Sequence, residues 1–249
     1  MRHIRRNERG QLTIGGHIAV DLAERFGTPL YVYSGDGLVA HYAAFASAVS
    51  ELDCVVHYAV KANSSLGVLG LLAQQGAGAD IVSGGEMKRA LIAGIAPDKI
   101  VFSGVGKTDD EIRAALQAGI AQINAESATE LRHISQIAAE TERQAPVALR
   151  VNVNVDPGSH AKISTGQRST KFGIPVADGE AAMLYRQLCS DPNLIPRGLA
   201  VHIGSQLRKL DPFERAYQEL LALADMLRAE GLDVPMLDLG GGLGVDYEE

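Results

Sequence analysis

Short aliphatic runs recur along this chain, and stretches with helical spacing separate them. The runs occupy residues 55–60, 78–83, 99–104, 121–126, 147–153, 198–204 and 236–241. Among the separating stretches, residues 213–231 repeat apolar side chains every three or four positions and end in a glycine, as amphipathic helices do. Repeated strand–helix units with short links predict a parallel sheet covered by helices, which is the α/β class. One further run, residues 29–34, belongs to the N-terminal segment and need not pair with this sheet.

The alternation of side chains within these runs favours a closed barrel. Successive residues of a strand face opposite sides. One side is aliphatic, whereas the other is small or polar and includes Lys61, Gln122, Asn124, Glu126, Arg150, Asn152, His202 and Asp238. A doubly wound sheet is apolar on both faces, and a sheet with one wet face normally comes with antiparallel hairpins, for which these runs carry no turn signal. A (β/α)8 barrel with a polar site at the carboxyl ends of its strands fits the pattern best.

Seven such strands can be counted, whereas a complete barrel needs eight. The next helix should begin where the sequence stops. Either the count misses a strand or the chain is part of a longer polypeptide, and we expect the second, with a barrel that lacks its last strand. Residues 1–34 would form an N-terminal segment, and residues 35–249 the barrel domain.

Composition and charge narrow the functional classes. The net charge is −7 with no long charged run, which argues against nucleic acid or an anionic membrane as the main partner. No stretch approaches the ~18 unbroken apolar residues of a membrane span, and no apolar segment follows the basic N-terminus as in a secretory signal. Cys54 and Cys189 are too few and too far apart for a disulfide framework or a C-x-x-C metal site. A cytoplasmic enzyme without a metal is the default expectation.

Lys61 ends the run 55–60 and permits two interpretations. It could mark the strand end and extend its amine to water. Alternatively, a buried amine with a lowered pKa is suited to form a Schiff base with a carbonyl. In a barrel it would converge with residues at the ends of other strands, namely Asp80, Ser103, Glu126, Arg150 and His202. Arg150 could instead neutralise a buried acid such as Glu86 or Glu126.

A cluster of glycines follows the last strand. Gly240, Gly241, Gly242 and Gly244 leave backbone N–H groups open to close approach by an anion. Their spacing does not fit the dinucleotide pattern G-x-G-x-x-G, so a single phosphate is the better interpretation. A strand-end lysine, a histidine and a phosphate turn together suggest pyridoxal phosphate. The long polar stretch 154–177 is interpreted as a lid or interface loop, with a disordered insertion as the alternative.

Several segments resemble the diaminopimelate decarboxylases, which belong to the alanine-racemase-like, fold-type III pyridoxal-phosphate decarboxylases. They are "GTPLYVYS", "YAVKANSSLGVLGLLAQQGAGADIVSGGE", "DKIVFSGVGKTDDEI", "INAES", "SHAKISTGQRSTKFGI", "HIGSQL" and "LDLGGGLGVDY". The resemblance runs in order from about residue 28 to the last residue. Ornithine and arginine decarboxylases share the cofactor elements but are less similar to the "SGGE" and "ISTG" segments.

This resemblance implies a cofactor, a reaction and roles for individual residues. Lys61 would carry pyridoxal phosphate as a Schiff base, and His202 would stack on its ring. Ser205 with Gly240, Gly241 and Gly242 would hold the phosphate, and Asp80, Glu86 and Arg150 match positions beside the lysine and the cofactor. The implied reaction is decarboxylation of meso-2,6-diaminopimelate to L-lysine in lysine biosynthesis, by a homodimer when complete.

The chain also departs from the family. "RVNVNVDPGSH" lacks the proline and the acidic residue that usually follow "RVN". The family continues into the eighth strand and a C-terminal β-domain, to which residues 1–34 would also belong, so this segment alone is expected to be inactive. Two alternatives stay open: another basic-amino-acid decarboxylase or racemase of the same fold type, and a non-catalytic pyridoxal-phosphate-binding homologue.

Overall fold

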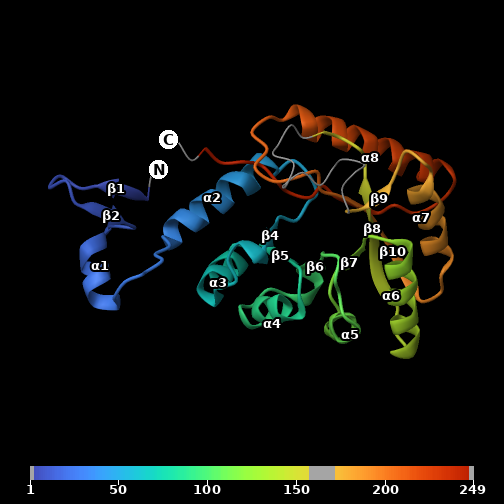
Figure 1. The fold of residues 1–249 in the computed structure, drawn as a ribbon, viewed down its shortest axis with the longest axis horizontal. Coiled ribbons are helices and arrows are strands. Elements are labelled where there is room, and N and C mark those ends of the chain that lie inside the picture. The colour runs from blue at the N-terminus through green and yellow to red at the C-terminus, as the bar shows by residue number, and fades with distance from the viewer. Residues whose placement is uncertain (1–2, 157–171, 247–249) are drawn as a thin grey trace. The chain divides into compact units, whose positions relative to one another are not determined.

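The computed structural model of the chain describes residues 3–156 and 172–246. Its backbone forms two compact units, residues 1–81 with 85–100 and residues 82–84 with 101–249. Figure 1 labels most of the strands and helices of both. Among the described residues, no helix combines the length and the apolar character that crossing a membrane requires.

The first unit begins with a small antiparallel sheet that the sequence did not indicate. Its elements are β1 (Ile4–Arg6), β2 (Leu12–Ile14), β3 (His17–Ile18) and the helix α1 (Ala19–Phe26). Asn7 holds the first turn, because its Oδ1 accepts hydrogen bonds from the backbone N–H groups of Arg9 and Gln11 at 3.0 and 2.9 Å. Residues 29–34, an aliphatic run in the sequence, contain no strand.

The rest of the first unit contains two parallel strands. Its elements are α2 (Gly35–Ala48), β4 (His57–Ala59), the 3₁₀ turn η1 (Val60–Ala62), α3 (Leu66–Gln74), β5 (Gly78–Ile81), α4 (Gly84–Ile92) and the 3₁₀ turn η2 (Pro97–Lys99). β4 and β5 pair in parallel, with Ala59 opposite Asp80. Val68 and Leu72 of α3 form a buried cluster with Ala77, which lies just before β5.

The second unit repeats strand–helix units around one parallel sheet. Its strands are β6 (Ile100–Phe102), β7 (Gln122–Ala125), β8 (Ala145–Asn152), β9 (Ile174–Pro175), β10 (Leu194–Val201) and β11 (Met236–Asp238). Its helices are α5 (Asp109–Ala118), α6 (Ala128–Glu140), α7 (Glu180–Ser190) and α8 (Asp211–Ala229). The strands lie in the order β6-β7-β8-β10-β11, with β9 beside β8. Figure 1 labels β6 to β10. In this register Arg150 lies opposite Ala200, and Ala200 lies opposite Asp238.

These elements confirm the predicted α/β architecture. Each of the seven runs predicted as a sheet strand overlaps one of the parallel strands β4, β5, β6, β7, β8, β10 and β11. Every strand stops before its predicted end, as β11 does at Asp238 rather than at residue 241. The polar residues and glycines at the predicted strand ends therefore lie in the loops that follow the strands, outside the hydrogen bonding of the sheet. The helix predicted over 213–231 is α8, and Gly231 follows it with a φ of 84°.

Candidate functional site

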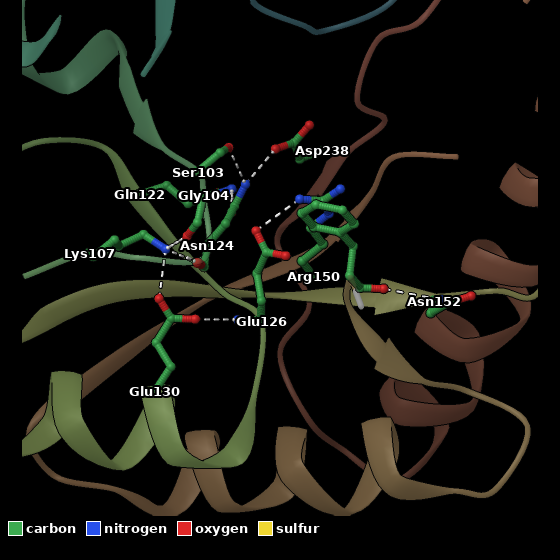
Figure 2. A network of polar contacts seen from close by, with 11 residues as sticks. Ser103, Gly104, Lys107, Gln122, Asn124, Glu126, Glu130, Arg150, Asn152 and Asp238 are labelled. Atoms are coloured by element: carbon green, nitrogen blue, oxygen red, sulfur yellow. Dashed lines mark hydrogen bonds and ion pairs between the residues drawn. The ribbon is translucent and has the colours of Figure 1, made fainter. Parts of the chain in front are cut away.

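Buried polar side chains of the second unit lie on the strand face that alternation marked as polar. Gln122, Asn124, Glu126 and Asn152 are each at most 8% exposed, although they are amides or a carboxylate. Burying such groups is unfavourable unless they are hydrogen-bonded. Figure 2 shows Gln122, Asn124 and Glu126 in one connected network at the carboxyl ends of β7 and β8, whereas Asn152 Nδ2 donates separately to the Phe172 carbonyl oxygen at 3.1 Å.

Asn124 is the centre of this network. Its Nδ2 donates hydrogen bonds to Ser103 Oγ at 3.2 Å and to Asp238 Oδ2 at 3.0 Å, and its Oδ1 accepts one from Gln122 Nε2 at 2.7 Å. β7 and β11 are separated by β8 and β10, so in a flat sheet they would lie ~14 Å apart. A direct hydrogen bond between them therefore requires this part of the sheet to curl. The contact supports the barrel predicted from side-chain phase.

Arg150 pairs with Glu126 on the same face. The Arg150 Nη1 to Glu126 Oε1 distance is 2.8 Å, and the two side chains are 11% and 4% exposed. The guanidinium also lies over the ring of Phe172, 5.1 Å from its centroid. Glu126 Oε2 is buried without a hydrogen-bond partner among the described residues. Of the two acids considered for Arg150 from the sequence, the structure selects Glu126.

The glycine turn after β11 is fixed against the end of β10. Gly240 N–H donates to Asp238 Oδ1 at 2.9 Å, and Gly241 N–H donates to His202 Nδ1 at 3.3 Å. Tyr217 of α8 donates its hydroxyl proton to the Leu239 carbonyl oxygen at 3.2 Å. Burial raises the pKa of Tyr217, and the charge of Asp238 raises it further, so the hydroxyl stays a donor at neutral pH.

At two positions of this turn only glycine fits, because a side chain would be strained and would collide with the backbone. Gly240 and Gly242 have φ values of 67° and 110°, in the region that L side chains rarely adopt. A Cβ on Gly240 would collide with the Val201 carbonyl oxygen, and a Cβ on Gly242 with the Gly204 carbonyl oxygen. Gly241 differs, because a Cβ there would meet nothing within 4 Å. The open space at Gly241, beside His202, can accommodate an anion.

The contrast between Gly242 and Gly241 gives a paired prediction. We expect Gly242→Ala to lower the free energy of unfolding by more than about 1 kcal/mol, because it adds backbone strain to a collision with a carbonyl. Gly241→Ala should leave stability nearly unchanged. Urea unfolding of both variants measures the difference. Equal losses of stability would show that the turn is not built as described.

The predicted site residues fall into two groups. In the first unit, Lys61 lies in η1, exposed and directly beyond β4, rather than at the buried strand end that one interpretation required. Asp80 lies in the neighbouring strand β5, opposite Ala59, and Glu86 lies in the first turn of α4. The strand ends bring Lys61 and Asp80 to the same edge of this parallel pair.

The second unit gathers the other predicted residues. Arg150 belongs to β8, and His202 and Ser205 follow β10. Gly240, Gly241 and Gly242 form the turn after β11. Of the loop predicted over 154–177, residues 157–171 lie outside the described part, and Ile174 and Pro175 form β9.

Sequence reasoning missed Lys107 and Glu130. Lys107 Nζ lies 2.8 Å from Glu130 Oε1, with side-chain exposures of 1% and 15%. Glu130 could have been found from its position three residues after Ser127, the helix N-cap, since that spacing is typical of a residue that bonds back to the helix start. Nothing in the sequence around Lys107 indicates that its amine is buried.

A curled parallel sheet covered by helices, with charged side chains and a glycine turn at the carboxyl ends of its strands, is typical of α/β-barrel enzymes. Within that class, a family model described as "Pyridoxal-dependent decarboxylase, pyridoxal binding domain" matches residues 36–249. The chain therefore belongs to this family.

Named relatives agree with the family match. The chain is 50% identical over 242 residues to a diaminopimelate decarboxylase of Vibrio cholerae, covering 97% of this chain and 58% of that protein. A crystal structure of diaminopimelate decarboxylase from Helicobacter pylori complexed with L-lysine is 41% identical, with a TM-score of 0.89 and coverage of 92% and 58%. A lysine decarboxylase from Selenomonas ruminantium is 26% identical, with a TM-score of 0.82 and coverage of 98% and 58%. The chain thus spans a little over half the length of the relatives it matches.

Proposed function

We propose that the complete protein decarboxylates meso-2,6-diaminopimelate to L-lysine with pyridoxal phosphate as its cofactor. The observation that carries this proposal is the glycine turn, open at Gly241 and bonded to His202, on the barrel face that also holds Arg150. The choice of substrate follows the relatives named diaminopimelate decarboxylase, which are 40–51% identical to this chain. The homologous structures in complex with L-lysine bind the product that the proposed reaction would yield.

The residues present fit this cofactor. The turn leaves free space beside Gly241, next to His202, which suits a phosphate. We assign phosphate binding to Gly240, Gly241, Gly242 and Ser205, and contact with the ring to His202. The exposed amine of Lys61 is accessible to an aldehyde.

Each residue would have a distinct part in the reaction. Lys61 would bind the aldehyde carbon and later hold the proton that is returned to the substrate carbon. Asp80, at the neighbouring strand end, would orient that amine. Arg150, held in place by its ion pair with Glu126, would present its positive charge to the cofactor. When bound, pyridoxal phosphate supplies the electron sink that accepts the pair left by the departing carboxylate. The remaining proposals for the complete protein are a homodimer and a cytoplasmic location.

Substrate profiling of the complete protein tests the proposal. We expect L-lysine and carbon dioxide from meso-diaminopimelate. Turnover of ornithine or arginine should be at least about 10²-fold slower, because a substrate that leaves buried polar groups of the site without a partner is strongly disfavoured. Preferred turnover of ornithine or arginine would support the related-decarboxylase alternative. Binding of pyridoxal phosphate without turnover of any amino acid would support the non-catalytic alternative.

A further inference from the structure

Lys107 is a buried lysine for which the proposed chemistry has no use. Its Nζ donates hydrogen bonds to the Gly104 carbonyl oxygen at 2.6 Å, the Asn124 carbonyl oxygen at 2.7 Å and Glu130 Oε1 at 2.8 Å (Figure 2). An ammonium group has three protons to donate, and three acceptors take them. This amine is therefore fully engaged, unlike one that must attack an aldehyde. Its contacts indicate a different role.

The acceptors of Lys107 tie together the carboxyl ends of two neighbouring strands. Gly104 follows β6, and Asn124 belongs to β7. Glu130, in the first turn of α6, uses its other oxygen to accept a hydrogen bond from the Glu126 backbone N–H at 2.7 Å. The ion pair thus fixes the backbone at residue 124 directly and at residue 126 through Glu130.

Residues 124 and 126 are the ones whose side chains hold the site. Asn124 bonds Asp238, which accepts the Gly240 N–H of the glycine turn. Glu126 pairs with Arg150. Two continuous chains of contacts therefore lead from the Lys107–Glu130 pair, one to the glycine turn and one to the Arg150 guanidinium.

The burial of this ion pair needs an explanation other than stability. Taking two charges out of water is costly, and apolar residues of similar volume often serve equally well. We propose that Lys107 is a positioning residue for the pyridoxal-phosphate site. With Glu130 it holds the end of β7, so that Asn124 and Glu126 fix the glycine turn and Arg150 around the cofactor. The identity of the cofactor rests on the proposed function, whereas the positioning does not.

The test compares variants of the complete protein. Lys107→Met removes the charge, and the double variant Lys107→Met/Glu130→Met removes both charges, so that no unpaired carboxylate remains. Arg113→Met is the matched control, because Arg113 of α5 forms an exposed ion pair with Glu140 of α6, the helix that also carries Glu130. Two quantities are measured: the dissociation constant of pyridoxal phosphate, and hydrogen exchange at the Gly240 amide in the cofactor-free protein.

We expect the dissociation constant of pyridoxal phosphate to rise at least about tenfold in both Lys107 variants. This is a typical effect of removing a residue that supports the binding residues without touching the ligand. The double variant should regain stability in urea unfolding but not affinity. The Gly240 amide should exchange faster in both Lys107 variants than in Arg113→Met. Wild-type exchange at Gly240 in the double variant would overturn the positioning role, as would wild-type affinity. Failure of the wild-type protein to bind pyridoxal phosphate would overturn the proposed function, and the Gly240 exchange would still decide the role of Lys107.

Discussion

Lys61→Ala in the complete protein is expected to abolish covalent attachment of pyridoxal phosphate and to lower turnover by at least about 10²-fold. The lower bound is the contribution of one positioned proton-transfer group, and loss of the attachment point adds to it. Lys61 lies in η1, the turn that follows β4, beside the end of β5, and it is exposed, so that an aldehyde can reach its amine.

Attachment is measured by reducing the cofactor-loaded protein with borohydride and locating the modified peptide by mass spectrometry. Lys88→Ala serves as the control, since Lys88 is an exposed lysine on α4 of the same unit. It should keep both the modification and the turnover. A modified peptide that persists unchanged in Lys61→Ala would assign the attachment to another lysine. Lys107 is the least suitable of these, because its amine already donates three hydrogen bonds.

The side-chain phase within strands was the most informative property of the sequence. It placed Gln122, Asn124, Glu126 and Asn152 on one polar face, and all four are buried there. Phase depends only on the two-residue period of a strand, so it can be derived without knowing which strands are neighbours. It therefore predicted the barrel-type face and the residues at its edge.

Partners within that face could not be derived in the same way. The hydrogen bond between Asn124 and Asp238 joins residues 114 positions apart and depends on how the sheet curls. Arg150 had two candidate acids in the sequence, and only the register of β7 with β8 and the curl of the sheet decide for Glu126. Lys107 was missed because a long side chain can turn inward or outward from a loop. Sequence patterns indicate which side a residue faces, whereas long-range packing decides what it contacts.

The N-terminal sheet was missed for a local reason. β1 and β2 are three residues long, which is too short for alternation to show. Their connection depends on the Asn7 side chain and on Gly10, whose φ is 73°. Neither residue belongs to a two-residue hairpin signal such as Asn-Gly.

Arg150→Met is expected to lower the free energy of unfolding of the complete protein by about 3–5 kcal/mol at pH 7. Removing one partner of a buried ion pair leaves the other charge without compensation, and such changes are strongly destabilising. The remaining carboxylate of Glu126 is 4% exposed, and its Oε2 has no partner among the described residues even with Arg150 present. Urea unfolding measures the loss. The exposed Arg186–Glu230 pair between α7 and α8 provides the control variant Arg186→Met, for which only a small change is expected.

A second substitution distinguishes an uncompensated buried charge from lost packing. Glu126→Gln in the Arg150→Met background removes the charge and should restore much of the stability at pH 7. A loss that Glu126→Gln does not relieve would mean that Arg150 stabilises the fold through its packing against Phe172 rather than through its charge.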